Sequence, residues 1–533
     1  MNRSEHINKL QNNNFDLFII GGGINGAGIA RDASMRGLSV ALVEAKDFAS
    51  GTSSKSSKLI HGGIRYLENF DFHLVFEALS ERSCLYQMAP HLVHPLRFMI
   101  PLFADSRVGM FKMGLGMWLY DALSLFRAPK LHERLNAEET QLRMPILKEH
   151  NLKGSYVYSD AYMDDDRLVH ETLRSAIQHK AVISNYVKMD YLKKNDALGL
   201  YEIQCRDAIS GQVFTVTAKK VISTVGAWTD EVGKNINLNW TKKLRPTKGI
   251  HLTLPKDRLP LQSAVVMGAE NSDRIVFAIP RHEMVIIGTT DTDYHGSPTD
   301  VGATAEDVSY LLKVAQSYFP NAKLQNSDFI ASYAGVRPLV KDDAGSEGKT
   351  SREHSIWTDQ NSGVTFVAGG KYTTYRLIAQ QAVDFIFGKK SVVDTKVSLN
   401  SWTSPMSYQE SLSKVQEFSD KYSVPVHAVK MLCERYGMET PEILHKYKQY
   451  KNYWQIEAAQ AIETTMCLNL LDFYTRRVPL FLAERNHGLD YMNDIAIVFQ
   501  ELLNLIDAQI ELQKKDLTEF INKELAWKRC TDE

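Results

Sequence analysis

The sequence predicts an α/β protein with a dinucleotide-binding unit, a second sheet-rich layer and a helical C-terminal region. Three observations support this prediction. A glycine-rich turn at residues 21–26 lies between a strand-length apolar run and a segment with helical character. Residues 240–340 contain alternating patterns typical of half-buried strands, and much of residues 400–533 has the pattern of helices.

Residues 15–43 have the pattern of a strand, a glycine-rich turn, a helix and a second strand, and Glu44 follows directly. In such a unit Gly21 makes the turn, Gly23 lets the backbone approach a pyrophosphate, and Gly26 lets the helix pack on the strand. The helix N-terminus faces the phosphates, and an acid about 20 residues further on accepts a hydrogen bond from a ribose. The pattern predicts dinucleotide binding. A glycine-rich turn in an unrelated βαβ unit is the alternative.

A run rich in hydroxyl groups and cations follows at residues 51–68 and includes a Gly-Gly pair. A polar surface loop would rarely continue into residues 59–63, which have the pattern of a buried, tightly turned segment. We therefore expect this run to pass close beside a phosphorylated cofactor. Further along, a strand at residues 364–368 leads into a second Gly-Gly pair and a helix. The helix N-terminus is suited to stabilising negative charge on the ligand.

Composition is that of a large globular protein of two or three domains, with 533 residues, 44% of them hydrophobic and 23% charged. The 62 basic and 63 acidic residues leave a net charge of −1, which argues against general nucleic-acid binding. Residues 1–14 lack the apolar core of a signal peptide, and five scattered cysteines favour free thiols over disulfides or a metal site. A cytoplasmic protein without a metal is expected. Three consecutive acids at 164–166 favour helix capping over metal binding.

An apolar stretch at residues 108–126 is interrupted by two charged residues, so a membrane-spanning helix is a poor interpretation. Two alternatives remain. The stretch is either a core helix or a helix that lies on the membrane face between flanking basic residues.

Together these motifs resemble those of the FAD-dependent glycerol-3-phosphate dehydrogenases, most closely the aerobic bacterial enzymes. The segments that carry the resemblance are residues 21–26 with Glu44, 52–65, 288–291, 335–338 and 369–376. The resemblance is continuous from about residue 15 to residue 390 and looser beyond residue 400. It implies a Rossmann-type FAD-binding domain of the D-amino-acid-oxidase-like class, a mixed-sheet substrate domain and a helical C-terminal domain.

The expected domain boundaries combine the patterns with this resemblance. They are 15–105 and 150–235 for the first two parts of the FAD-binding domain, 236–335 for the substrate domain, 336–390 for the return to the FAD-binding domain, and 400–533 for the helical domain.

The resemblance also implies non-covalently bound FAD and oxidation of sn-glycerol 3-phosphate to dihydroxyacetone phosphate. Electrons would pass to quinone, with the protein on the inner face of the cytoplasmic membrane. Two alternatives stay open: an oxidase that reduces oxygen to hydrogen peroxide, and a non-catalytic flavin-binding redox sensor. Oxidase relatives tend to carry an inserted segment ahead of the C-terminal domain, and no such segment is found, which favours the dehydrogenase. The C-terminal third suggests helix packing or a homodimer. The pair Arg476–Arg477 is assigned to the substrate side, to an interface or to solvent.

A dianionic phosphate needs several converging cations, and arginine binds phosphate oxygens in a bidentate way. The candidate substrate-binding residues are Arg65, Arg274, Arg337, Arg352 and Lys371. By resemblance, Arg337 and Arg352 correspond to substrate-site arginines and Lys371 to the lysine after the Gly-Gly turn. A structural ion pair is the alternative for any single arginine.

Oxidation of the secondary alcohol requires a base for the hydroxyl proton, and histidine is the usual one near neutral pH. His61 and His251 are the candidates, with a satisfied structural histidine as the alternative for each. An arginine such as Arg337 could instead stabilise the developing alkoxide while water takes the proton.

Cofactor contacts are expected from the turns and from the hydroxyl-rich run. The candidates are Gly21, Gly23, Gly26, Glu44, Thr52, Ser53, Ser54, Ser57, Lys58, Leu59, Val187, Gly226, Gly335, Gly370 and Thr373. Among them, Ser53, Ser54, Ser57 and Lys58 are expected near the pyrophosphate or the isoalloxazine, Leu59 at the ring, and Val187 at the adenine.

Overall fold

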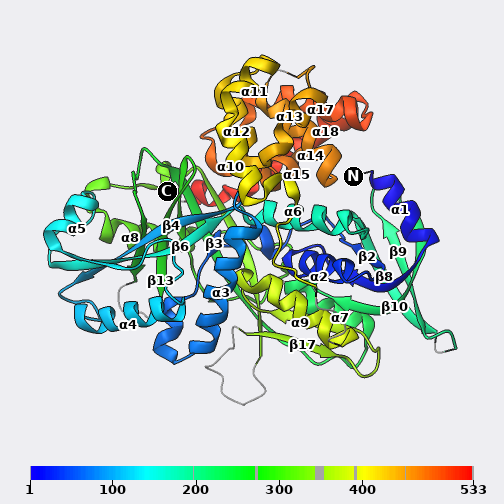
Figure 1. Ribbon diagram of the computed structural model, residues 1–533, viewed down its shortest axis with the longest axis horizontal. Coiled ribbons are helices and arrows are strands. Elements are labelled where there is room, and N and C mark those ends of the chain that lie inside the picture. The colour runs from blue at the N-terminus through cyan, green and yellow to red at the C-terminus, as the bar shows by residue number, and fades with distance from the viewer. Residues whose placement is uncertain are drawn as a thin grey trace.

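The computed structural model describes residues 2–195, 197–269, 274–341, 353–388, 393–450 and 452–530, and it describes only the backbone of Arg65, Asn69 and Cys530. Within this part of the chain, two sheets and a helical C-terminal group form the architecture (Figure 1).

Eight strands form the first sheet. They are β1 (Asn14–Ile20), β2 (Val40–Val43), β7 (Val182–Ser184), β8 (Val187–Asn195), β9 (Leu200–Asp207), β10 (Val213–Ser223), β17 (His354–Thr358) and β18 (Thr365–Gly369). The central strands β18, β10, β1, β2 and β7 are parallel, and β9 and β8 continue from β10 as an antiparallel extension. All four residues of β2 are buried, as expected for a parallel strand covered on both faces.

Helices pack against this sheet. They are α1 (Arg3–Asn12), α2 (Ile24–Met35), α6 (Asp165–Gln178), α7 (Thr229–Ile236) and α9 (Tyr375–Phe387). Helix α2 packs between α6 and α9, and small residues such as Ala27, Ala30 and Ala33 are fully buried there. This close packing brings the N-terminus of α2 to the carboxyl end of β1.

Ten strands form the second sheet. They are β3 (Leu59–Ile60), β4 (Val93–Phe103), β5 (Glu133–Asn136), β6 (Leu152–Met163), β11 (Leu244–Pro255), β12 (Ala264–Gly268), β13 (Ile275–Arg281), β14 (Met284–Gly288), β15 (Thr292–Asp293) and β16 (Ala331–Val340). The accompanying helices are α3 (Phe72–Met88), α4 (Met110–Leu123), α5 (Ala137–Arg143) and α8 (Ala305–Tyr318).

Strand pairing differs from the expected domain boundaries at three places. β3, in the expected first part of the FAD-binding domain, pairs with β6 in the second sheet. β4 pairs with β6 along nearly its whole length and with β12, so both β4 and β6 belong to the second sheet rather than to the FAD-binding sheet. β16 stays paired with β11 as far as Val340, past the expected return at residue 336. These pairings join residues far apart in the chain, and local patterns carry no information about them.

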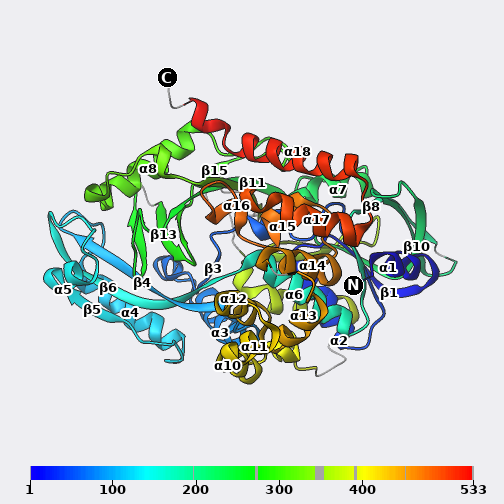
Figure 2. The same cartoon turned by 90° about the horizontal axis from the view of Figure 1, so that it is seen from above.

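The C-terminal region consists of helices. They are α10 (Pro405–Ser413), α11 (Val415–Tyr422), α12 (Val426–Tyr436), α13 (Thr440–Lys446), α14 (Tyr453–Thr465), α15 (Leu470–Arg476), α16 (Leu480–Ala483), α17 (Met492–Leu503) and α18 (Asp507–Glu524). Figure 1 shows them in yellow to red, gathered over α6, and Figure 2 shows α18 along the outer edge of the group.

The structure partly decides whether the apolar stretch at residues 108–126 is a core helix or a surface helix. Met117 and Tyr120 are buried against the core, whereas Phe111 and Trp118 are 82% and 60% exposed. The helix therefore packs one face and leaves a strongly apolar face open. No helix in the described ranges has the length and apolarity to cross a membrane.

Two of the three acids at the start of α6 serve as ion-pair partners, and the third, Asp166, accepts a hydrogen bond from Arg167 N at 2.7 Å. Asp164 pairs with Arg281 at 2.5 Å, Asp165 pairs with Lys58, and the Asp164 side chain makes no capping hydrogen bond. Within the described part of the chain, no group of three or more His, Cys, Asp or Glu side chains is arranged to hold a metal.

Candidate active site

A cavity of about 690 Å³ lies between the two sheets and is lined by residues from both. The predicted site residues that line it are Gly21, Gly23, Glu44, Thr52, Ser53, Ser57, Leu59, His61, Val187, Gly226, His251, Arg274, Gly335, Arg337, Gly370, Lys371 and Thr373. Segments spread over most of the chain thus converge on one space. Arg352 and the side chain of Arg65 lie outside the described residues.

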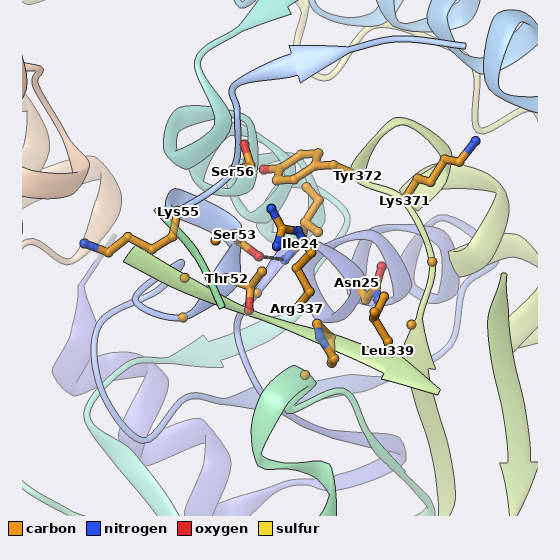
Figure 3. Close-up of a pocket in the computed structure, with 18 of the residues that line it drawn as sticks. Ile24, Asn25, Thr52, Ser53, Lys55, Ser56, Arg337, Leu339, Lys371 and Tyr372 are labelled. Carbon is orange, nitrogen blue, oxygen red and sulfur yellow. Dashed lines mark hydrogen bonds between the residues drawn. The ribbon is translucent and has the colours of Figure 1, made fainter. Parts of the chain in front are cut away.

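The dinucleotide turn forms one end of the cavity. Gly21 has φ +106°, a conformation that residues with a side chain rarely adopt. A Cβ at Gly26 would lie 2.0 Å from the Gly21 carbonyl oxygen, so only glycine lets α2 begin this close to β1. In η1 (Thr52–Ser54), the Ser53 hydroxyl accepts a hydrogen bond from Ile24 N at 3.0 Å, which Figure 3 shows at the start of α2.

The Glu44 carboxylate is fixed at the tip of β2. It accepts hydrogen bonds from Gly22 N at 2.8 Å and from Lys46 N at 2.9 Å. Burial raises the pKa of this carboxyl group, and the two backbone donors act in the opposite direction. The group is thus oriented by the backbone and lines the cavity, as a ribose acceptor requires.

Three predicted cofactor contacts do not line the cavity. The Lys58 ammonium is buried in its ion pair with Asp165 and donates to Ser54 O at 3.3 Å. The Ser54 side chain is buried as well, and Gly26 packs α2 against β1. Gly26 has the packing role expected of it, and the contacts expected of Ser54 and Lys58 stay predictions. Lys58 is held by an acid 107 positions away in the sequence.

Arg337, on β16, lines the same cavity. Its guanidinium donates to Thr289 Oγ1 at 2.9 Å and to Thr290 O at 3.2 Å, and it pairs with Asp291 at 3.2 Å. A Cβ at Gly249 would lie 2.3 Å from Arg337 Nη2, so a glycine on β11 makes room for the side chain. The guanidinium is held in place while part of it faces the cavity.

Lys371 and Tyr66 form a second cationic position. The Lys371 ammonium lies 3.9 Å from the centroid of the Tyr66 ring, and both residues line the cavity. Tyr66 lies in η2 (Ile64–Asn69), directly after the Gly-Gly pair, and the sequence analysis missed it. In the sequence, only its position next to Arg65 in the hydroxyl-rich run indicated that Tyr66 could lie at the site. Arg274 is exposed where it borders the cavity.

The two candidate bases have different surroundings. His251 Nε2 is hydrogen bonded to Ser57 Oγ at 2.8 Å, and its ring stacks on Tyr333 at 4.7 Å. The His61 backbone N–H donates to Thr373 Oγ1 at 3.2 Å, which ties the hydroxyl-rich run to the turn before α9. Both histidines line the cavity, so the geometry leaves each in reach of a ligand.

Burial lowers the pKa of His251 well below 6.5, and the charges of Arg337 and Lys58 act in the same direction. We therefore expect His251 to stay neutral when substrate is saturating. The limiting rate of flavin reduction should then fall with decreasing pH only below pH 6.5. Stopped-flow measurements between about pH 5 and 8 check this. An inflection at 6.5 or above that His251→Gln removes would contradict it.

A dinucleotide turn and a fixed guanidinium that line one cavity define the protein as a nucleotide-cofactor oxidoreductase. The family described as FAD dependent oxidoreductase matches residues 16–376, and the C-terminal domain of alpha-glycerophosphate oxidase matches residues 407–510. The chain belongs to the FAD-dependent oxidoreductase family, and FAD is its cofactor. The D-amino-acid-oxidase-like fold with a helical C-terminal domain is confirmed.

The resemblance to glycerol-3-phosphate dehydrogenases is confirmed too. The aerobic glycerol-3-phosphate dehydrogenase of Staphylococcus aureus strain bovine RF122 / ET3-1 is 32% identical over 540 residues, covering 98% of this chain and 97% of that protein. The structure of the glycerol-3-phosphate dehydrogenase from Bacillus halodurans complexed with FAD has a TM-score of 0.82 at 28% identity, covering 98% and 97% of the two chains. Glycine oxidase from Geobacillus kaustophilus, at 20% identity and a TM-score of 0.56 over 73% of this chain and 99% of its own, shares the fold.

Proposed function

We propose that the protein oxidises sn-glycerol 3-phosphate to dihydroxyacetone phosphate and passes the electrons to a membrane quinone. The observation that carries this proposal is that the fixed guanidinium of Arg337 and the dinucleotide turn line one cavity. The name of the Staphylococcus aureus relative supports the substrate. FAD, when bound, supplies the two-electron acceptor for the hydride from carbon 2.

Arg337 and Lys371 bind the substrate phosphate in this proposal. Arg337 is pre-oriented by Thr289 and Asp291, so little side-chain entropy is lost when the phosphate arrives. The substrate hydroxyl loses its proton to a histidine as the C2–H bond breaks and the carbonyl forms. His251, whose Nε2 is hydrogen bonded to Ser57, and His61 are the two candidates for this acceptor.

The experiment mixes FAD-loaded protein anaerobically with sn-glycerol 3-phosphate and follows the oxidised-flavin absorbance. We expect bleaching with this substrate and none with glycerol, which lacks the phosphate. Flavin that stays oxidised would overturn the proposal. Reoxidation with a ubiquinone analogue or with oxygen then separates a dehydrogenase from an oxidase, the second candidate, which the matched C-terminal domain description keeps open.

An exposed apolar surface supports the membrane part of the proposal. It consists of Phe70, Phe72, Phe76, Phe111, Leu115, Trp118, Leu119, Leu125 and Phe126, from two neighbouring parts of the fold. Exposed Lys112, Arg127 and Lys130 accompany it, which suits an anionic lipid surface. The segment from His61 to Tyr66 lines the cavity and leads directly into Phe70, so the same element connects the cofactor site to this surface.

Replacing Phe111 and Trp118 together with serine is expected to weaken binding to anionic vesicles by at least about 100-fold, because each large apolar side chain contributes about 1.5–3 kcal/mol when buried. Co-sedimentation with phosphatidylglycerol vesicles measures the change. Leu238→Ser is the matched control, since Leu238 is 97% exposed outside this surface. Equal binding of the double variant and the control would contradict membrane attachment here.

A further inference from the structure

Two arginines at the end of α15 are buried against the loop that follows Glu44. Arg477 makes a bidentate ion pair with Asp47, with Nη1–Oδ2 at 2.7 Å and Nη2–Oδ1 at 2.8 Å. Arg476 Nε pairs with the same carboxylate at 2.7 Å. The side chains of Asp47 and Arg477 are 0% and 4% exposed. The arginine pair thus lies at an interface between the C-terminal domain and the FAD-binding domain.

A second loop of the FAD-binding domain joins the same contact. Asn185, directly after β7, donates to Asp47 Oδ1 at 3.1 Å and to Met466 O at 2.9 Å. The Tyr186 hydroxyl donates to Asp472 Oδ2 at 2.6 Å, and Asp472 also pairs with Arg476. We call Asp47, Asn185, Tyr186, Asp472, Arg476 and Arg477 the Asp47 cluster. Two carboxylates and two guanidiniums balance its charge.

Both loops of the Asp47 cluster also build the ribose and adenine end of the cofactor cavity. Val187 N donates to Glu44 O at 2.8 Å, and Tyr186 N donates to Lys46 O at 2.9 Å. On the other side of the loop, Ala49 N donates to Gly22 O at 3.1 Å, within the dinucleotide turn. Glu44, Lys46 and Val187 line the cavity. The loop from Glu44 to Ala49 is therefore held between the glycine turn and α15.

The buried ion pairs of the Asp47 cluster couple the position of α15 to that of the Glu44 loop. A buried ion pair that loses one partner leaves an uncompensated charge without water, so the remaining group moves or its surroundings rearrange. Asp47 is only three residues from Glu44, and any rearrangement of Asp47 shifts the backbone that orients the Glu44 carboxylate. Sequence alone did not distinguish an interface from solvent for Arg476 and Arg477.

We infer that the C-terminal helical domain is part of the FAD-binding machinery: the Arg477–Asp47 pair holds the Glu44 loop in the conformation that binds the cofactor. Arg477 is a positioning residue, because it acts through Asp47 and does not line the cofactor cavity. Docking of the C-terminal domain and FAD affinity are then coupled, and the coupling is reciprocal. The inference rests on FAD as the cofactor and is independent of the proposed substrate.

The test compares FAD release from full-length, FAD-loaded variants after dilution, followed by the fluorescence of free FAD. Arg477→Met and Asp47→Asn are expected to raise the dissociation constant about tenfold, within the roughly 5- to 150-fold range of coupling between sites. Arg174→Met is the matched control. Arg174 joins α6 to Glu439 of the same C-terminal domain at 2.5 Å, away from the Glu44 loop. The Arg174→Met variant should have lower stability and unchanged FAD affinity.

Reciprocity supplies a second readout that general destabilisation would not produce. Bound FAD is expected to slow hydrogen exchange in α15 of the wild-type protein and to lose this effect in Arg477→Met. Unchanged FAD affinity in Arg477→Met, or equal weakening in Arg174→Met, would overturn the inference. If Arg477→Met does not fold, Arg477→Lys is judged by the same criterion, since lysine keeps the charge and loses the bidentate geometry.

Discussion

Replacing Arg337 with alanine lowers the second-order rate constant for flavin reduction by sn-glycerol 3-phosphate by about 100- to 1000-fold. This corresponds to roughly 3–4 kcal/mol, the cost of removing one partner of a desolvated charge pair. The reason is geometric: Thr289, Thr290 and Asp291 hold the guanidinium at the cavity wall, and alanine leaves the bound phosphate without that partner. Anaerobic stopped-flow absorbance measures the rate constant directly.

Arg245→Ala is the matched control for this prediction. Arg245 lies on β11 as an exposed arginine paired with Asp293 at 2.9 Å, and it does not line the cavity. Its removal should leave the rate constant within about twofold, because an exposed ion pair contributes only about 0–1 kcal/mol. If both variants lost activity equally, the effect would be general electrostatics, and the assignment of Arg337 to the phosphate would fail.

Replacing Gly26 with alanine is expected to yield protein that is largely free of flavin. The added Cβ would lie 2.0 Å from Gly21 O and 2.8 Å from Thr224 Oγ1, and backbone at the start of α2 cannot move aside without opening the turn. Overpacking of this kind costs about 1–3 kcal/mol, and loss of FAD removes further stability. The ratio of flavin to protein absorbance reports occupancy, and thermal unfolding reports stability.

Gly116→Ala provides the comparison within the same protein. Gly116 lies inside α4, and, apart from its chain neighbours and the backbone of its own helix, no atom lies within 4 Å of the position that its Cβ would take. Alanine there should keep full flavin content and raise stability by up to about 1 kcal/mol, because glycine weakens a helix interior. Normal flavin content in Gly26→Ala would show that α2 tolerates a wider approach to β1 than the turn geometry implies.

Local motifs allowed the cofactor end of the site to be predicted. Gly21, Gly26 and Glu44 lie within one strand–turn–helix–strand unit, where short-range spacing determines position. The fold class and FAD followed from that unit and from the family resemblance, and both are confirmed.

Long-range partners escaped prediction. Lys58 lies in the hydroxyl-rich run and was expected at the cofactor, yet Asp165 holds it in the core. Tyr66 was missed because its contact with Lys371 joins segments about 300 residues apart along the chain. The pairing of β4 with β6 was hidden for the same reason, since neighbouring strands in a sheet need not be neighbours in sequence.

The measurement that tests the central claim most directly is a single-turnover reaction of the FAD-loaded protein with sn-glycerol 3-phosphate under anaerobic conditions, without an added acceptor. The proposed reaction predicts complete flavin bleaching and one dihydroxyacetone phosphate formed for each flavin reduced, because each oxidation releases two electrons. Flavin that stays oxidised with no dihydroxyacetone phosphate, in protein that an amine or a hydroxy acid does reduce, would contradict the account.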